Sequence, residues 1–194
     1  MMKISEEKQN IINQIREIYS LISKDKDFSK LIPEVRMNIS GSLSKAKSKS
    51  EIAAIEGRIT IINGFPKASG DIKFGTSDHT ARLILTAKEF DNSINFVINL
   101  KYIPELIESI KRYTKLELQE ISREKQPENV KKKEYSTMQW LIKESVKEKG
   151  KIPDIIWDKG AIGKEPMMRL FGKNSNDLIR KLEQIIKLIK KEKI

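Results

Sequence analysis

The chain has 194 residues, which is enough for one folded domain with a sizeable core and few for two domains. It contains no cysteine and one histidine, which excludes disulfides, thiolate nucleophiles, sulfur-ligated metals and metal sites built from several histidines. No apolar run approaches the roughly 20 residues that span a bilayer, and the N-terminal residues are polar and charged. We therefore expect a cytoplasmic protein without a membrane partner.

The net charge is +11, from 38 Lys and Arg against 27 Asp and Glu. A basic excess can bind nucleic acid by releasing counterions from phosphates. Here, however, the lysines are interleaved with glutamates, and aromatic residues, at 6%, are scarce for base stacking. We interpret most of the excess as a charged, solvated surface with no specific nucleic-acid partner, and it is also compatible with a small anionic ligand.

Isoleucines at helical spacing, with charged residues between them, predict an amphipathic helix over Ser5–Ser23. In the segment 31–40, apolar and polar residues alternate after Pro33, which predicts a half-buried strand. Arg36 and Asn38 are expected on the polar face of this strand, which is either exposed to solvent or part of a ligand cleft.

The next segment, 43–55, combines small and apolar residues and predicts two short helices, the second ending at Gly57. Residues 58–63 then predict a strand that Arg58 opens, and the pair Asn63-Gly64 predicts a tight turn after it. Arg58 is therefore expected at a strand edge, close to the glycine-containing stretch that follows.

The stretch 69–85 concentrates the polar chemistry of the chain. Gly70 and Gly75 flank a short predicted strand, and the second turn presents hydroxyl groups, backbone N–H groups, a carboxylate and the imidazole of His79. Such a turn suits a phosphorylated ligand, although a lone histidine is more often a hydrogen-bonded structural residue. The apolar residues 83–87 then predict a buried strand.

Strands and helices continue to alternate in the second half of the chain. Apolar or alternating segments predict strands at 94–100, 116–121, 155–157 and 167–171. Helical spacing, with Pro104 at a first turn and a capping pattern at Ser136 and Gln139, predicts helices at 104–113, from 136 onward and at 176–191. The polar segment 123–133 is predicted to be an exposed loop.

Between the last two predicted strands, Gly160, Gly163 and Lys164 indicate a glycine-bracketed turn, which Glu165 follows. Backbone N–H groups and a lysine can hold phosphate in such a turn, but the spacing differs from that of a P-loop and no helix clearly follows. On its own, the motif is a weak signal for phosphate binding.

Several neighbouring strands are joined by turns too short for a crossover helix, so antiparallel pairs must be mixed in. We predict a single α/β domain over residues 1–194, a three-layer α/β/α fold with a mixed, largely antiparallel sheet. Within it, an N-terminal helix region covers 1–31, the core covers 32–172, and a C-terminal helix covers 173–194.

Three stretches together resemble the archaeal ThiN family of thiamine-phosphate synthase domains: LIPEVRMNI with SEIAAIEGRI, FGTSDHTARLIL, and STMQW followed by PDIIWDKGAIGKEPMMRLFG. Their order and spacing match over about residues 32–172. The resemblance implies a fold like that of class II aldolases, without their metal-binding histidines. It also implies that the domain occurs alone, behind a hydroxymethylpyrimidine kinase domain, or as the ligand-binding half of a transcription regulator.

The resemblance implies a transferase that joins hydroxymethylpyrimidine diphosphate to hydroxyethylthiazole phosphate and releases pyrophosphate. The essential arginine and histidine of the family fall on Arg58 and His79, which we expect to be catalytic. Mg²⁺ is expected with the diphosphate, and its protein ligands are left unassigned. Other polar residues of the matched stretches are expected to bind substrate: Arg36, Asn38, Ser77, Asp78, Arg82, Lys164 and Glu165.

Alternatives remain for the residues and for the function. Arg58 could instead form a surface ion pair with Glu56 or Asp71. A non-catalytic domain that senses thiamine phosphate for a transcription regulator would use the same pocket, and a general nucleic-acid binder would use the basic charge. The presence of both Arg58 and His79 favours the enzyme. We also expect a homo-oligomer, and the resemblance allows for an upstream kinase domain.

Overall fold

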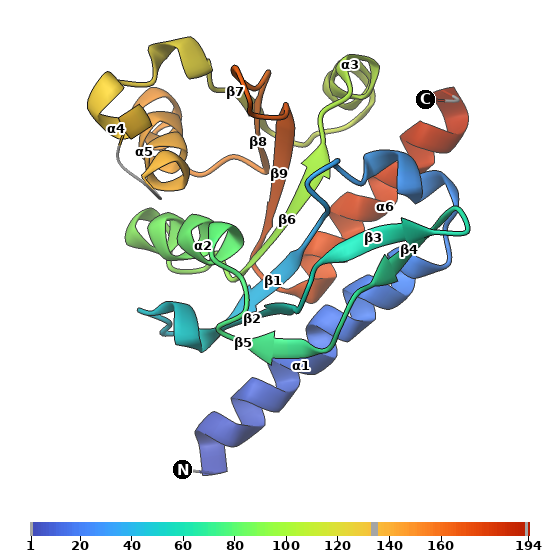
Figure 1. Ribbon diagram of the computed structural model, residues 1–194, viewed down its shortest axis with the longest axis vertical. Helices are drawn as coiled ribbons and strands as arrows, with labels where there is room; N and C mark the ends of the chain where they lie inside the picture. The colour runs from blue at the N-terminus through green and yellow to red at the C-terminus, as the bar shows by residue number, and fades with distance from the viewer. Residues whose placement is uncertain (1, 133–135, 193) are drawn as a thin grey trace.

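The computed structural model describes residues 2–132, 136–192 and 194, which fold around one mixed β-sheet (Figure 1). Its strands are β1 (Ile39–Ser42), β2 (Ile52–Ile55), β5 (Ile72–Phe74), β6 (Phe96–Lys101), β7 (Leu118–Glu120), β8 (Ile155–Asp158) and β9 (Met167–Gly172). They lie in the order β5-β2-β1-β6-β9-β8-β7. Within this sheet β7 and β8 are parallel, and every other neighbouring pair is antiparallel.

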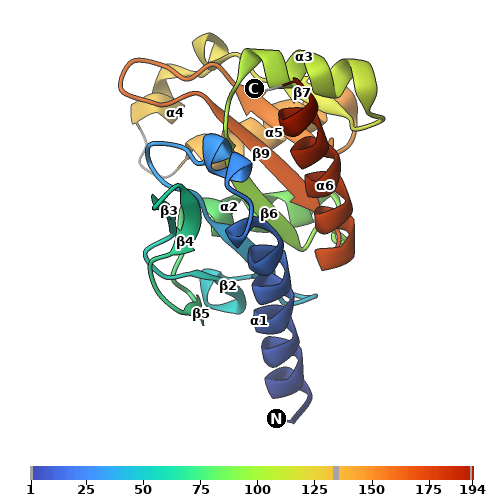
Figure 2. The ribbon, with the colours of Figure 1, turned by 90° about the vertical axis from the view of Figure 1, so that its right-hand side faces the viewer.

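Helices cover both faces of the sheet and so make three layers (Figures 1 and 2). One face carries α1 (Met2–Ser23), α3 (Pro104–Tyr113) and α6 (Ser175–Glu192). The other carries α2 (His79–Phe90) and α5 (Thr137–Lys149), with the short helix α4 (Glu128–Lys132) beside α5. The predicted α/β/α fold with a mixed, largely antiparallel sheet is therefore confirmed. Among the described residues, no helix combines the length and apolar character needed to cross a bilayer.

Two further strands form a separate ribbon beside the main sheet. They are β3 (Ile59–Ile62) and β4 (Phe65–Ala68), and they pair antiparallel. The turn between them is the predicted one: Asn63 and Gly64 have φ of 53° and 81°, as a tight hairpin turn requires. The ribbon begins at Ile59, directly after Arg58, so β2 and the ribbon together hold the turn that contains Arg58.

The core lies on both faces of the sheet and follows the predicted helical spacing. In α1, the side chains of Ile15, Ile18 and Ile22 are fully buried, and in α6 those of Leu178 and Leu182 are fully buried. Such stripes bury one face of each helix, which is what holds an amphipathic helix on a sheet. The predicted helices at 5–23, 104–113 and 176–191 are thus confirmed to within two or three residues.

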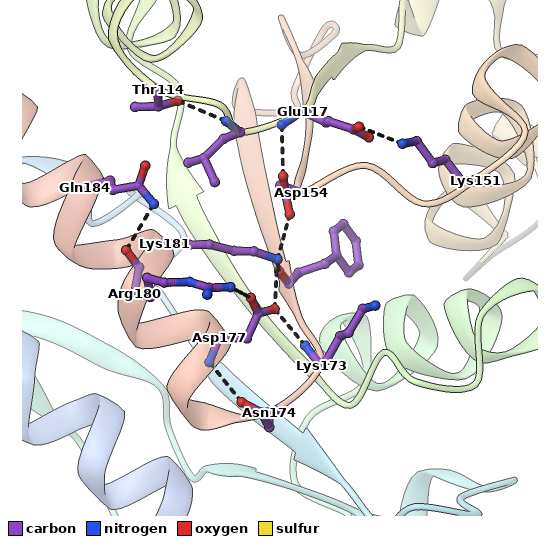
Figure 3. Close-up of polar contacts among 12 residues, drawn as sticks. Thr114, Glu117, Lys151, Asp154, Lys173, Asn174, Asp177, Arg180, Lys181 and Gln184 are labelled. Atoms are coloured by element: carbon purple, nitrogen blue, oxygen red, sulfur yellow. Dashed lines mark hydrogen bonds and ion pairs between the residues drawn. The ribbon is translucent and has the colours of Figure 1, made fainter.

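Lys181 of α6 fastens that helix to the end of the sheet (Figure 3). Its ammonium group lies 2.6 Å from the Asp154 carboxylate, 2.9 Å from the Asp177 carboxylate and 2.8 Å from the carbonyl oxygen of Phe171. A lysine that is 8% exposed is stable only if its charge is compensated, and here two carboxylates and a carbonyl do so. We interpret this cluster as structural.

Residues 83–87, predicted as a strand, lie inside the helix α2. The β-branched and apolar character of Leu83 and Ile84 suggested a strand, but the buried positions Thr80, Leu83, Ile84 and Ala87 follow helical spacing. Because α2 packs against the sheet and against α5, its inner face is apolar for most of its length. The prediction of a strand at 83–87 is therefore wrong, because tertiary contacts override the local strand preference of the run.

The segment 43–55 was expected to form two helices, and this prediction is wrong. A short 3-10 turn, η2 (Lys49–Glu51), is followed by strand β2, which is buried along its whole length between β1 and β5. A fully buried strand has no polar alternation, so its small residues Ala53 and Ala54 resemble helix formers in sequence.

Two other segments differ from the sequence-based expectation. The strand predicted in 31–40 begins only at Ile39, because residues 34–35 form a turn and Met37 makes a single bridge to Ile59. The segment 123–133, expected to be an exposed loop, contains the 3-10 turn η3 (Arg123–Lys125) and α4, and Lys133 lies outside the described residues.

Candidate active site

A cavity of about 510 Å³ opens near the starts of β1 and β9, between the N-terminal ends of α2 and α5. It brings together eight of the nine residues predicted for the site. They are Asn38, Arg58, Ser77, Asp78, His79, Arg82, Lys164 and Glu165. These residues come from four separate parts of the chain, so the cavity is a product of the tertiary fold.

Arg58 lies at the rim of this cavity, in the turn between β2 and β3. Its φ is 71°, in the left-handed region that costs a non-glycine residue about 1–2 kcal/mol. The guanidinium is exposed, and Nη1 donates a hydrogen bond of 2.6 Å to the carbonyl oxygen of Val35. The alternative ion pair with Glu56 does not form, because the Glu56 carboxylate binds Lys73 at 2.7 Å. A strained backbone that carries an exposed cation into a cavity favours a functional role.

His79 is the first residue of α2 and keeps part of its side chain in contact with water. The surrounding protein displaces enough solvent to lower the pKa of His79, and the positive charge of Arg58 lowers this pKa further. Asp78 acts in the opposite direction, and Arg82 and Arg169 reinforce the lowering. At neutral pH the imidazole is therefore uncharged in the free protein, so it can donate one N–H and accept at the other nitrogen.

The chain just before and within the first turn of α2 lines the cavity. The Asp78 carboxylate accepts two hydrogen bonds from Arg82, at 2.9 Å and 3.0 Å, and these bonds lower the pKa of Asp78. The hydroxyl groups of Ser77, Thr80 and Ser40 form a hydrogen-bonded chain. Because the first N–H groups of a helix have no partner within the helix, this end of α2 carries partial positive charge toward which anions are attracted.

The loop between β8 and β9 brings Lys164 and Glu165 to the cavity. Gly160, the second residue of this loop, has a φ of 75°, and a Cβ at that position would lie 2.3 Å from the carbonyl oxygen of Lys164, so only glycine fits. The Glu165 carboxylate accepts hydrogen bonds from the backbone N–H groups of Glu34 at 2.9 Å and Val35 at 3.2 Å. Glu165 therefore ties this loop to the 34–35 turn, while the Lys164 side chain is exposed.

Asn38 lines the cavity but is occupied with the backbone. It is 4% exposed, and its side-chain amide donates to the carbonyl of Ile55 and accepts from the N–H of Ile55, both at 3.0 Å. Its own N–H donates to Oδ1 of Asn99 at 2.8 Å. Asn38 therefore lies on the cavity wall, as one of the two expected alternatives had it, but it precedes β1 and joins β1, β2 and β6 from inside the fold.

Arg36 is the predicted site residue that the main cavity does not include. It has a φ of 69°, is exposed, and donates from Nη1 to the carbonyl of Gly57 at 3.3 Å. It lines an adjoining cavity of about 480 Å³, which shares Arg58, Ser77 and Asp78 with the main one. The expected half-buried strand is absent at this position, which is why Arg36 lies on a turn.

Sequence reasoning missed a buried ionic cluster in the cavity. Asp158, which is fully buried, lies 2.7 Å from Nη1 of Arg169 and 3.1 Å from Nε of Arg123, and it accepts the N–H of Gly160 at 2.9 Å. Arg123 was assigned to an exposed loop but is 7% exposed. The signal that could have identified the cluster is a charged residue, Arg169, inside the otherwise apolar run MMRLFG.

The described residues contain no group of three or more Asp, Glu or His side chains placed to hold one metal ion. The carboxylates that line the main cavity, Asp78 and Glu165, are engaged with Arg82 and with backbone N–H groups. This donor set fits a metal ion that arrives on an anionic ligand better than one held by the protein alone.

The fold and this cavity define a three-layer α/β/α domain with a cation-lined, partly apolar pocket suited to an anionic small molecule. The chain belongs to the thiamine-phosphate synthase ThiN family, whose family model matches residues 14–184.

Two curated relatives agree with this assignment. The bifunctional thiamine biosynthesis protein ThiDN of Methanocaldococcus jannaschii is 38% identical over 183 residues, which cover 93% of this chain and 42% of the relative. The thiamine-phosphate synthase ThiN of Methanothermobacter thermautotrophicus is 34% identical over 182 residues, which cover 94% of each chain. The chain thus spans less than half of the bifunctional relative and nearly all of the other.

Two solved structures resemble the fold closely. The C-terminal domain of protein MJ0236 has a TM-score of 0.85 at 37% identity, covering 95% of this chain and 97% of that one. The C-terminal domain of a phosphomethylpyrimidine kinase has a TM-score of 0.79 at 33% identity, covering 91% and 96%.

Proposed function

We propose that the chain is a thiamine-phosphate synthase that condenses hydroxymethylpyrimidine diphosphate with hydroxyethylthiazole phosphate, giving thiamine phosphate and pyrophosphate. Family membership supports the reaction class. The observation that carries the assignment of the site is that Arg58 and His79, 21 residues apart in sequence and on different elements, line one cavity.

In this reaction the thiazole nitrogen attacks the methylene carbon of the pyrimidine substrate. A carbon–nitrogen bond forms, the carbon–oxygen bond to the diphosphate breaks, and its electron pair stays on the departing oxygen. Because the nucleophile belongs to the substrate, the protein has to stabilise the growing negative charge of the leaving group. The absence of cysteine from the chain is compatible with this demand.

Arg58, Lys164 and His79 are proposed to bind the diphosphate. The guanidinium of Arg58 offers a fork of N–H donors to phosphate oxygens, and Lys164 adds a mobile positive charge. His79, uncharged at neutral pH, donates a hydrogen bond to the departing group, whose negative charge in turn favours the imidazolium. The positive end of α2 adds N–H donors on the same side.

The remaining predicted residues are proposed to have supporting roles. Ser77, Asp78 and Arg82 shape the start of α2 and contribute polar groups to the cavity. Asn38 and Glu165 hold the walls in place through their bonds to backbone groups. Arg36 is proposed to contact the part of a ligand that extends into the adjoining cavity.

Mg²⁺ is proposed to enter with the diphosphate, bound mainly by phosphate oxygens and water, and to neutralise part of the leaving group's charge. Asp78 precedes His79 in the chain and lines the same cavity, so its carboxylate could add a ligand to the metal at the cost of one Arg82 contact. Removal of the metal with a chelator is expected to abolish pyrophosphate release while the fold remains intact.

Kinase fusion is proposed as one context of the domain, supported by the bifunctional relative and by the solved C-terminal domain of a phosphomethylpyrimidine kinase. A kinase of this kind would supply the pyrimidine diphosphate. The homo-oligomer, the cytoplasmic location and the lack of a specific nucleic-acid partner stay predictions.

The decisive assay mixes the chain with both substrates and Mg²⁺ and follows pyrophosphate release and thiamine phosphate formation. Release that depends on both substrates is the expected result. Calorimetry with thiamine phosphate separates the alternatives, because binding of this compound without any turnover would instead identify a sensor domain. Tight, salt-sensitive binding to unrelated DNA would identify a nucleic-acid binder.

A further inference from the structure

The cavity is lined by cations of two kinds. Arg58 and Lys164 are exposed at its opening, whereas Arg123 and Arg169 are 7% and 3% exposed and form part of its inner wall. Exposed cations are screened by water, but buried ones act through a medium of low polarity and attract anions more strongly. The inner pair therefore requires an explanation of its own.

The inner cluster has an excess of positive charge. The fully buried Asp158 supplies one negative charge to two guanidinium groups, those of Arg123 and Arg169. Among the described residues, their other hydrogen-bond acceptors are neutral: Gln126 accepts from Arg123 at 3.3 Å and the Met167 carbonyl accepts from Arg169 at 3.4 Å. A buried, uncompensated charge is costly, so this arrangement favours an anion in the cavity.

Nor do the other acids of the cavity wall compensate this charge. Within the described residues, the carboxylates lining the cavity are Asp78, which binds Arg82, and Glu165, which binds backbone N–H groups. Burial lowers the pKa of Arg169, Asp158 opposes that shift, and the neighbouring charge of Arg123 adds to the lowering. Arginine guanidinium groups nevertheless stay protonated in proteins.

Both inner arginines retain unused donors. In the described part of the chain, the hydrogen bonds of Arg169 all leave from Nη1. Nε of Arg123 lies near Asp158 but is buried there without a hydrogen bond in the described structure. Arg169 also lies directly opposite Asn99 in the pairing of β9 with β6, so an amide lies beside it on the cavity wall.

Apolar side chains line the same cavity as the cations. They are Val35, Leu83, Met138 and Met167, so the lining combines exposed cations, buried cations and apolar groups. Such a lining suits an apolar ring that carries an anionic group, with room for a second anionic group near the exposed cations.

We propose that Arg123 and Arg169, held in place by Asp158, bind the phosphate monoester of the thiazole substrate. The assignment rests on the proposed function, in which one of two anionic groups must depart and the other remains on the product. The exposed cations suit the departing diphosphate, because it can leave directly to solvent. The buried pair suits the phosphate that stays attached throughout the reaction.

Calorimetry with the full chain tests this assignment, using hydroxyethylthiazole phosphate and the unphosphorylated alcohol as separate ligands. In Arg169→Met and Arg123→Met, the preference for the phosphate over the alcohol should fall about 10- to 100-fold, the size expected for a lost charged hydrogen bond. Affinity for the alcohol should stay within about twofold, because a neutral Arg–Asp pair remains. Arg169→Lys, which keeps the charge, should restore part of the preference.

Arg16→Met is the matched control, since Arg16 is exposed on α1 and bonds only to nearby Asn13 among the described contacts. It should bind both ligands as the parent does. Arg58→Met should weaken the apparent affinity for the pyrimidine diphosphate and leave the preference for thiazole phosphate unchanged.

The proposal is overturned if folded Arg169→Met and Arg123→Met keep the parent's preference for the phosphate, or if they lose affinity for the diphosphate instead. Folding is checked by circular dichroism. Pyrophosphate release by the parent is measured separately, so failure of the enzyme assignment and failure of this phosphate site give different results.

Discussion

Arg58 and His79 line the same cavity, and the charge of Arg58 helps to lower the pKa of His79. The two groups approach from a turn after β2 and from the first residue of α2. A cation beside an imidazole favours the neutral ring. An arriving diphosphate would be attracted by Arg58, and its negative charge would raise the pKa of His79 back toward the usual value. The pair is therefore electrostatically coupled before any substrate binds.

The first prediction concerns activity. Arg58→Ala and His79→Ala should each lower kcat/KM for pyrophosphate release by about 10²- to 10³-fold, because each removes a donor to the leaving group. Arg16→Ala serves as the control and should keep the parent rate, since it lies on an exposed face of α1. Variants that are folded and turn over at the parent rate would show that these two residues do not carry the reaction.

The second prediction concerns the protonation of His79. As the sole histidine of the chain, it gives a single imidazole signal in an NMR titration. In the free protein its pKa should lie below the usual value near 6.5, and addition of pyrophosphate should raise it. In Arg58→Ala the pKa of the free protein should move upward. An unchanged signal on addition of pyrophosphate would contradict the proposed contact.

The same shift has a consequence for stability. A histidine whose pKa is lowered by folding binds protons less readily in the folded state than in the unfolded state. Its contribution to stability is therefore complete above the unfolded value near 6.5 and is lost as the pH falls through the folded value. Urea unfolding measures this contribution as the change in the free energy of unfolding between pH 7.5 and pH 5, which lie roughly one unit or more on either side of 6.5. The parent should lose more stability over this range than His79→Gln does.

The third prediction separates backbone strain from side-chain function at Arg58. Arg58→Gly and Arg58→Ala both remove the guanidinium and its bond to Val35, but glycine tolerates the φ of 71°. Arg58→Gly should therefore be more stable to urea than Arg58→Ala by about 1 kcal/mol, and both should be equally inactive. Equal stabilities would mean that the backbone relaxes in the variants.

The fourth prediction concerns the buried cluster. Asp158→Asn leaves two buried guanidinium groups without a carboxylate, so it should lower the free energy of unfolding by about 3–5 kcal/mol. Asp27→Asn is the matched surface change, because Asp27 forms an exposed pair with Lys30, and it should cost less than about 1 kcal/mol. A similar, small cost for both would show that Asp158 does not compensate the arginines.

Much of the fold followed from local patterns. Three elements carry their signal within a few residues: α1 in its isoleucine spacing, α3 in its opening proline, and the hairpin in its Asn63-Gly64 turn. They could therefore be predicted without knowing which other elements they pack against. The errors fall where burial removes the local signal. β2 is buried between neighbours and lacks alternation, and α2 carries β-branched residues that favour strands in other settings.

The site divides in the same way. Arg58, His79 and Lys164 stand next to glycines or a helix start, where turn chemistry makes polar residues noticeable in sequence. Arg123, Asp158 and Arg169 are recognisable only together, because their significance depends on distances of about 3 Å between residues far apart in the chain. The expectation that Asn38 and Glu165 contact substrate directly did not foresee that their side chains bond to backbone groups.

The order of strands also bears on how the protein is made. β9 pairs with β6 from Phe96 to Lys101, but it is synthesised about 70 residues later, after the helices α3, α4 and α5 and the strands β7 and β8. Until β9 emerges from the ribosome, β6 has an unpaired apolar edge, which is a template for wrong partners. The nascent chain therefore passes through a stage at which the sheet is open at its centre. At that stage the part of the cavity wall that residues 163–169 supply does not yet exist.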